Sequence, residues 1–279
     1  MAGNFTGRYL SNDHPGPGKL VMNKNIVITA LLLSAIVVAC ATSPTGQRQL
    51  RLFSESQMAE MGSASYTEMK KKTPAAKEAA PNRRVQCVSN TLTAVVGGSW
   101  EVTLFDDDAA NAFALPGGKI GVYKGLLKVA TTPDQLAAVV GHEIAHVQAH
   151  HSNARLSAAS LTDVGLQIAS TISGGSAKGQ YMMAALGLGT QVGILLPYGR
   201  AQESEADVLG LNLMAKAGFN PNEAVTLWQN MARQGGGQPP EFMSTHPSHS
   251  TRIADLKARM PKAMQHYEQA RAAGKKPNC

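Results

Sequence analysis

The chain has 279 residues, enough for one or two domains with a buried core. Hydrophobic residues make up 43% of it and charged residues 16%, a balance that excludes a wholly disordered chain. The formal net charge is +7, but the basic residues are too scattered to form the basic face that nucleic-acid binding requires, so we expect no nucleic-acid partner.

The N-terminus resembles a targeting segment. Residues 1–21 lack a periodic pattern and precede a better start at Met22, so we interpret them as an over-extended reading frame. Residues 22–39 combine Lys24 with an uncharged apolar stretch that is short for a bilayer, which is typical of a signal peptide. A short transmembrane anchor is the alternative.

The end of this segment, Val37 to Cys40, resembles the lipobox of bacterial lipoproteins, in which the cysteine carries the lipid. We therefore predict lipidation at Cys40, membrane contact through that lipid, and a polar tether over residues 40–52. Because Ala41 rather than Asp follows the cysteine, the expected location is the periplasmic face of the outer membrane.

Cys87 and Cys279 are the other two cysteines. In an oxidising compartment they could form a disulfide. Cys87 also lies on an apolar face of a predicted helix, where a buried inert thiol is an equally ordinary state. Both interpretations stay open at this point.

The first predicted helices cover residues 53–72 and 81–96. Ser54 with Gln57 has the spacing of a capping box, and Gly97 ends the second helix. Residues 100–105 alternate as a strand does, and a hairpin is predicted from residues 111–115 and 119–123 across Pro116-Gly117-Gly118.

Further helices are predicted to start near Thr132, Arg200 and Asn220. Pro133 suits the first position of its helix, because that position needs no backbone donor. Residues 156–175 and 179–199 carry little charge, and we interpret them as a buried helix or a lid rather than a membrane span. A few strands among many helices predict an α+β fold.

The segment His142-Glu143-Ile144-Ala145-His146 has the clearest chemical pattern. On a helix His142 and His146 share a face, so both imidazoles can reach one metal ion. Glu143 is suited to accept a proton from an attacking water. Because the rest of this helix is apolar, burying these side chains without a metal would be costly, and we predict one zinc ion per chain.

A histidine is not expected as the third ligand. The position used by one type of zinc peptidase holds Ser152. Three turns of one straight helix cannot easily converge on a tetrahedral ion, so His150 and His151 are expected to be solvated or to cap the helix end.

A carboxylate further along the chain is the better candidate. Glu203 and Asp207 share a helix face, so Glu203 could complete the metal site. Asp207 could then accept the second ring N–H of a ligand histidine. Glu205 is expected to point away, solvated or paired with a lysine.

These motifs, with the segment Asn111 to Gly118 and His246-Pro247 followed by Arg252, resemble peptidase family M48, most closely its periplasmic lipoprotein branch. The resemblance covers about residues 53–260. It implies a zincin fold of the gluzincin type, mostly helical, with a small sheet whose edge strand flanks the zinc site. It further implies zinc on His142, His146 and Glu203, with Glu143 as the general base.

The resemblance also gives the predicted hairpin a role, since an edge strand beside the zinc can pair with an extended substrate. This substrate strand would consist of Asn111, Ala112, Phe113 and Ala114. His246 is either a transition-state donor or removable fourth ligand, or a loop residue that caps the next helix. Arg252 is expected to hold that loop by pairing with a carboxylate.

The expected organisation is a zinc metallopeptidase domain over residues 53–260 and a C-terminal tail over residues 261–279. Its expected activity is cleavage of unfolded or misassembled proteins in the bacterial envelope, with envelope polypeptides as substrates and outer-membrane assembly factors as partners. Two alternatives stay open. One is a periplasmic chaperone or assembly factor that binds clients with little cleavage, and the other is a latent peptidase gated by a lid or by His246.

Overall fold

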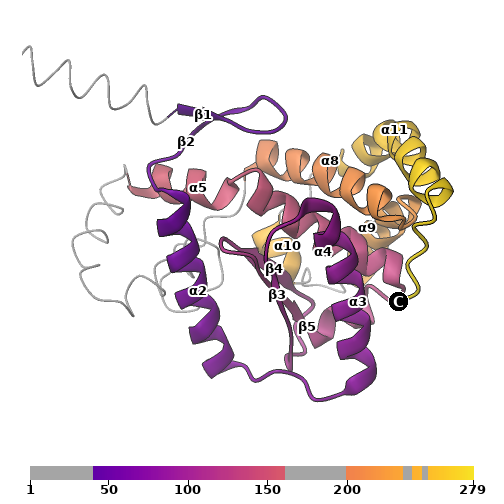
Figure 1. The fold of residues 1–279 in the computed structure, drawn as a ribbon, viewed down its shortest axis with the longest axis horizontal. Coiled ribbons are helices and arrows are strands. Elements are labelled where there is room, and N and C mark those ends of the chain that lie inside the picture. Colours follow the sequence, from indigo (N-terminus) through magenta and orange to yellow (C-terminus); the bar gives the residue numbers. More distant parts are fainter. Residues whose placement is uncertain (1–39, 161–198, 235–240, 247–250) are drawn as a thin grey trace, which may run out of the picture. The chain divides into compact units, whose positions relative to one another are not determined.

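A small mixed sheet lies among helices in the computed structural model, which describes residues 40–160, 199–234, 241–246 and 251–279 (Figure 1). Its strands are β3 (Glu101–Phe105), β4 (Ala112–Leu115) and β5 (Lys119–Tyr123), in the order β3-β5-β4. β5 runs parallel to β3 and antiparallel to β4. The predicted α+β class is confirmed, and β4 is an edge strand.

Apolar side chains cover both faces of the sheet. Phe105, Phe113 and Tyr123 pack against helix α2 (Glu55–Lys72) in one cluster. The alternate strand positions point into the main core with helices α3 (Ala79–Val96) and α4 (Pro133–Gln148). Burial on two faces explains why β4 is apolar at every position.

The helix starts and stops follow the predicted caps. Ser54 and Gln57 form a reciprocal capping box at α2. Gly97 ends α3 at a φ of 76°, a conformation that glycine adopts without strain. The hydroxyl of Thr132 accepts the backbone N–H of Gln135 at the start of α4. These local signals therefore predicted these helix ends correctly, whereas α3 begins at Ala79, two residues before the predicted start.

The remaining elements of the described chain, apart from an N-terminal hairpin, are helices. They are the 3-10 helix η1 (Lys124–Lys128), α5 (His151–Ser160), α8 (Arg200–Ala217), α9 (Asn222–Gln234), α10 (Glu241–Thr245) and α11 (Arg252–Ala272). The low-charge segment predicted as a lid lies outside the described residues, apart from Leu156–Ser160 in α5 and Gly199.

Helices α4 and α8 cross in close contact at two glycines. A Cβ atom on Gly210 would lie 2.8 Å from the backbone nitrogen of His142, and one on Gly141 would lie 3.2 Å from the carbonyl oxygen of Gly210. Only hydrogen fits at Gly210, so the two helices approach more closely than alanine would allow. This crossing brings the first turn of α8 near the His142-to-His146 segment of α4.

The segment predicted as a polar tether is folded. β1 (Cys40–Thr42) and β2 (Arg48–Leu50) form an antiparallel hairpin. Gln49 donates to the carbonyl of Ala149, and Gln47 donates to that of Ala201. Side-chain amides thus fix this hairpin to the helical domain. The polar composition of residues 40–52 does not predict these contacts with distant residues.

The segment predicted as a C-terminal tail also belongs to the domain. Helix α11 continues through Pro261 to Ala272. Cys279 then forms a disulfide with Cys87 on α3, with Cα atoms 5.6 Å apart. The alternative of a buried inert thiol at Cys87 is therefore wrong.

The predicted over-extended start, the signal peptide and the alternative anchor all fall on residues 1–39, outside the described part of the chain. Among the helices that the structure does describe, none combines the length and the apolar character needed to cross a bilayer.

Candidate metal centre

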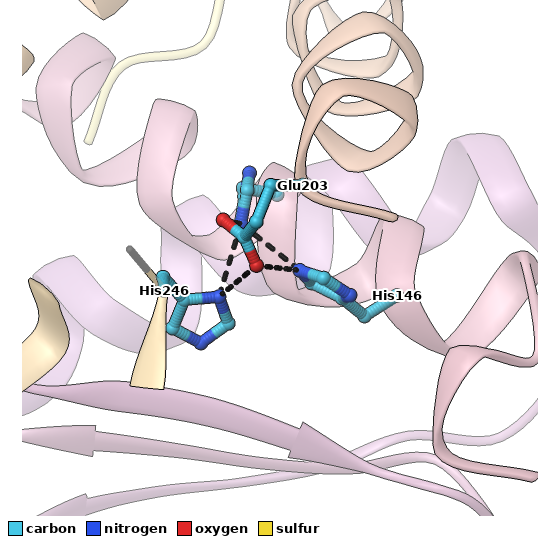
Figure 2. Close-up of side chains that lie close together, drawn as sticks. His146, Glu203 and His246 are labelled. Carbon is cyan, nitrogen blue, oxygen red and sulfur yellow. Dashed lines mark hydrogen bonds and ion pairs between the residues drawn. The ribbon is translucent and has the colours of Figure 1, made fainter. Parts of the chain in front are cut away.

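Four buried side chains from three parts of the chain converge on one point (Figure 2). His142 and His146 come from α4, Glu203 from the first turn of α8, and His246 from the position directly after α10. One donor atom of each lies within 4.8 Å of the others. The three residues predicted as ligands are thus brought together, and His246 joins them.

The spacing of the donor atoms fits a zinc ion. His142 Nε2 lies 3.0 Å from His146 Nε2 and 3.5 Å from Glu203 Oε2. His246 Nδ1 lies 3.1 Å from Glu203 Oε1. Adjacent corners of a tetrahedron with zinc–ligand bonds of about 2.0–2.1 Å are about 3.3–3.4 Å apart. Imidazole nitrogen and carboxylate oxygen are also ligands that zinc prefers.

Asp207 orients His142 and favours a cation at the cluster. Asp207 Oδ1 lies 3.0 Å from His142 Nδ1, on the far side of the ring from Nε2. Burial lowers the pKa of His142, but its contacts with Asp207 and Glu203 outweigh burial and raise the pKa to about 10. The surroundings therefore favour positive charge at this point, which a metal ion supplies.

Glu203 and His146 have the protonation states that metal binding needs. Burial raises the pKa of Glu203, but the imidazoles of His246, His142 and His146 outweigh it and hold the pKa far below its usual range. Burial lowers the pKa of His146 well below its ordinary value. An ionised carboxylate and a neutral imidazole therefore face the cluster.

Arg252 on α11 holds the two carboxylates of α8. Its Nη2 contacts Glu203, and its Nε donates to Asp207 Oδ2 over 2.8 Å. The guanidinium carbon also lies 4.0 Å from the centroid of the Trp228 ring. The carboxylates that pair with Arg252 are thus those of the metal centre.

Glu143 lies beside the cluster. Its Oε1 is 3.3 Å from His246 Nε2, and its carboxylate accepts a hydrogen bond from the backbone of Ala114 in β4. Burial raises the pKa of Glu143 above its ordinary value. A carboxylate with a raised pKa accepts a proton more readily near neutral pH.

The predicted substrate strand flanks Glu143. Asn111 accepts the backbone N–H of Tyr123, and Phe113 lies opposite Gly121, so the alternating ladder turns the N–H and C=O groups of Ala112 and Ala114 away from β5. The N–H of Ala112 donates to the side chain of Asn111 over 2.9 Å. The carbonyls of Ala112 and Ala114 therefore face the side of β4 that no described strand covers.

The predictions for Glu205 and His151 are wrong. Glu205 is 2% exposed and accepts hydrogen bonds from Thr45 instead of facing solvent or a lysine. His151 is 1% exposed, and its Nδ1 lies 2.8 Å from His146 Nδ1. The physical reason is a sharp turn at His150, where φ is 56°, so His151 begins a new helix behind the cluster. His150 itself is half-exposed and contacts Glu55.

Two aromatic side chains of the site were not predicted. Phe242 stacks on His246 with ring centroids 4.5 Å apart, and Trp228 lies under Arg252. Both rings also approach His142. In the sequence these two residues stand out only because aromatic residues are few, 5% of the chain. That scarcity does not identify which residues they contact.

Comparison with known proteins identifies relatives of this chain. The model of Peptidase family M48 matches residues 78–260. The mitochondrial metalloendopeptidase OMA1 of Saccharomyces cerevisiae is 34% identical over 191 residues, 66% of this chain and 53% of that protein. The protein of the same name from Schizosaccharomyces pombe is 38% identical over 184 residues, 64% of this chain and 53% of that protein. The chain thus spans about half the length of these relatives.

A bacterial relative matches over a smaller share. The beta-barrel assembly-enhancing protease of Escherichia coli is 33% identical over 165 residues, 56% of this chain and 33% of that protein. The predicted location at the periplasmic face of an outer membrane is therefore wrong, because the relatives matched over more of their length are named mitochondrial. A short apolar N-terminal stretch does not by itself identify a compartment. Lipidation of Cys40 stays a prediction.

Proposed function

This chain belongs to peptidase family M48, and on that premise we propose that it is a zinc-dependent metalloendopeptidase that cleaves unfolded or misassembled polypeptides. The observation that carries the proposal is the buried cluster of His142, His146 and Glu203 with a further carboxylate, Glu143, beside it. A site that only binds peptides has no use for a proton acceptor at this position, so Glu143 favours hydrolysis over a chaperone role.

His142, His146 and Glu203 would hold the zinc ion. When bound, zinc supplies a Lewis acid for the substrate carbonyl and lowers the pKa of a coordinated water toward about 7. The two neutral imidazoles do not cancel the metal charge, and the one carboxylate cancels it only in part. Asp207 and Arg252 keep these ligands in place.

Glu143 would move the proton. Its raised pKa suits it to take a proton from the attacking water and to return that proton to the leaving amine. The backbone N–H of Ala114 holds the carboxylate against the edge strand, so the proton acceptor and the substrate-binding strand are fixed relative to each other. Its burial keeps bulk water from competing for the proton.

The edge strand would select the class of substrate. Pairing with β4 engages the main chain of the substrate, which every sequence offers, and it requires an extended segment. A folded protein rarely presents such a segment, whereas an unfolded or misassembled one does. This geometry supports a role in protein quality control.

A latent form of the same peptidase is the second candidate, and the position of His246 favours it. Catalytic zinc sites keep three protein ligands and one open position. His246 Nδ1 lies 3.2 Å from His142 Nε2, at the distance of a fourth ligand. With His246 as the fourth ligand, a four-coordinate zinc ion would have no position left for water and substrate.

Cleavage of casein by the full chain tests the proposal. We expect cleavage to stop with a chelator, to return with added zinc, and to be absent from Glu143→Gln protein that still contains zinc. The matched control is Glu268→Gln, which changes an exposed carboxylate on α11 and should cleave like the wild type. Retained cleavage by Glu143→Gln contradicts the assigned proton acceptor.

A further inference from the structure

A chain of hydrogen-bonding groups runs from the metal ligand His146 to the N-terminal hairpin. His146 Nδ1 lies 2.8 Å from His151 Nδ1, and His151 Nε2 lies 3.2 Å from Glu205 Oε2. The other oxygen of Glu205 accepts the backbone N–H of Thr45 over 3.0 Å and its hydroxyl over 2.7 Å. His146, His151 and Glu205 are each at most 2% exposed.

With Glu205 ionised and His151 neutral, the direction of every hydrogen bond in this series follows. The backbone N–H of Thr45 can only donate, and an ionised Glu205 can only accept. Glu205 therefore accepts the N–H of His151 Nε2. A neutral imidazole has one donor and one acceptor, so His151 Nδ1 must accept from His146 Nδ1. The lone pair of His146 then lies on Nε2, which is the nitrogen that faces the cluster.

We infer that His151 and Glu205 are positioning residues for the metal ligand His146, and that Thr45 of the hairpin completes their hydrogen-bond chain. The inference rests on the proposed zinc function. It assigns to His146 what Asp207 does for His142, namely a partner for the ring nitrogen that does not face the metal. For His146 that partner is a second imidazole held by a carboxylate.

The arrangement also connects two distant parts of the sequence. Thr45 lies in the turn between β1 and β2, and Glu205 lies 160 positions later in the first turns of α8. Gln49 fastens the same hairpin to Ala149, just before the turn that places His151. The N-terminal hairpin therefore supports the side of His146 that carries Nδ1, the ring nitrogen that does not face the cluster.

Glu205→Gln replaces one hydrogen-bond acceptor of Glu205 by a donor and leaves the volume of the side chain almost unchanged. If the amide nitrogen faces His151, then Nε2 must accept, Nδ1 must donate, and the proton of His146 is driven onto Nε2, where the metal should bind. If the amide nitrogen faces Thr45, the amide oxygen still accepts from His151 Nε2, but the amide N–H groups face a backbone N–H that cannot accept, so that contact with the hairpin is lost. The first arrangement reverses the hydrogen bond to His146 and the second removes the link to Thr45, whereas a residue that only fills space would tolerate the exchange.

Two variants at His151 distinguish the loss of its hydrogen-bond acceptor from a change in side-chain volume. Asn at this position places an amide oxygen where Nδ1 now lies and can still accept from His146, whereas Leu cannot. The control is His150→Asn, because His150 is half-exposed and Asn tolerates its positive φ. The measurements are the zinc dissociation constant, by competition with a chromophoric chelator, the absorption spectrum of the Co²⁺-loaded protein, and thermal unfolding of the metal-free protein.

We expect Glu205→Gln and His151→Leu to weaken zinc binding about 10- to 100-fold, the usual effect of losing such a partner, and to shift the Co²⁺ bands. His151→Asn should stay closer to the wild type, and His150→Asn should match it. Unchanged zinc affinity in Glu205→Gln and His151→Leu overturns the inference, even if the metal-free protein unfolds at a lower temperature, since that would show packing alone. Zinc-loaded protein that does not cleave casein, either as the wild type or with His246→Ala, contradicts the proposed function, and the zinc affinities of the variants still decide this inference.

Discussion

Arg252 and Glu203 lie 49 positions apart in the sequence, yet their side chains are in direct contact and almost completely buried. Arg252 engages Oε2 of Glu203, so Oε1 is the oxygen that faces His146 and His246. The same guanidinium holds Asp207. One cation from α11 therefore sets the orientation of two carboxylates of the metal centre.

Arg252→Lys should weaken zinc binding about tenfold, as loss of an outer partner of metal ligands commonly does, because one ammonium cannot reproduce the two-sided contact with Glu203 and Asp207. The free energy of unfolding of the metal-free protein should fall by about 1–3 kcal/mol, because a buried acceptor loses its donor. Urea unfolding and chelator competition measure the two effects. Arg259→Lys, at an exposed position on the same helix, is the control. Equal effects of both substitutions would contradict the special role of Arg252.

His246→Ala should retain zinc, because His142, His146 and Glu203 remain, and it should raise the rate of casein cleavage. If about nine molecules in ten hold His246 at the fourth position, freeing that position raises the rate about tenfold. Cleavage rates at matched zinc content measure this, with the exposed neighbour Ser244→Ala as the control. A lower rate in His246→Ala would instead indicate that His246 assists the reaction.

Gly210→Ala should separate α4 from α8, because the added Cβ would lie 2.8 Å from the backbone nitrogen of His142. We expect a loss of about 1–3 kcal/mol in the free energy of unfolding, the usual cost of overpacking, together with weaker zinc binding. Thermal unfolding with and without zinc measures both. Gly199→Ala is the control, since the nearest atom to its Cβ would be 4.0 Å away. If Gly210→Ala behaves like that control, the helix crossing does not assemble the site.

Cys87→Ser should lower the free energy of unfolding by about 2–5 kcal/mol, because the disulfide joins residues 192 positions apart and restricts the unfolded chain. Urea unfolding of the wild type in reducing buffer should reproduce the loss. The variant should not respond to the reductant in this way. Equal stability of the reduced and oxidised wild type would show that the disulfide contributes nothing.

Local patterns predicted the parts of the fold that neighbouring residues determine. The caps at Ser54 and Thr132 specify helix starts through hydrogen bonds that span three residues. The spacing of His142 and His146 places two imidazoles on one face for the same reason. Such contacts need only a few adjacent positions, so the sequence alone is sufficient to predict them.

Contacts between distant segments were not predictable in this way. Glu205 pairs with Thr45 across 160 positions, and no local pattern marks either residue. The burial of His151 depends on a turn at a non-glycine residue, His150, which propensities disfavour. The sequence does not decide between the two roles of His246, because its position depends on how α10 packs against the cluster.

The edge strand β4 determines which hydrogen-bonding groups an inhibitor bound along it has to offer. Its two outward-facing N–H groups already have acceptors in Asn111 and Glu143, so the strand presents carbonyls at Ala112 and Ala114. A ligand along this strand must therefore supply amide hydrogens at alternate positions. Peptides in which those hydrogens are replaced by N-methyl groups or by the proline ring should lose binding, whereas the same changes one residue along the ligand should be tolerated.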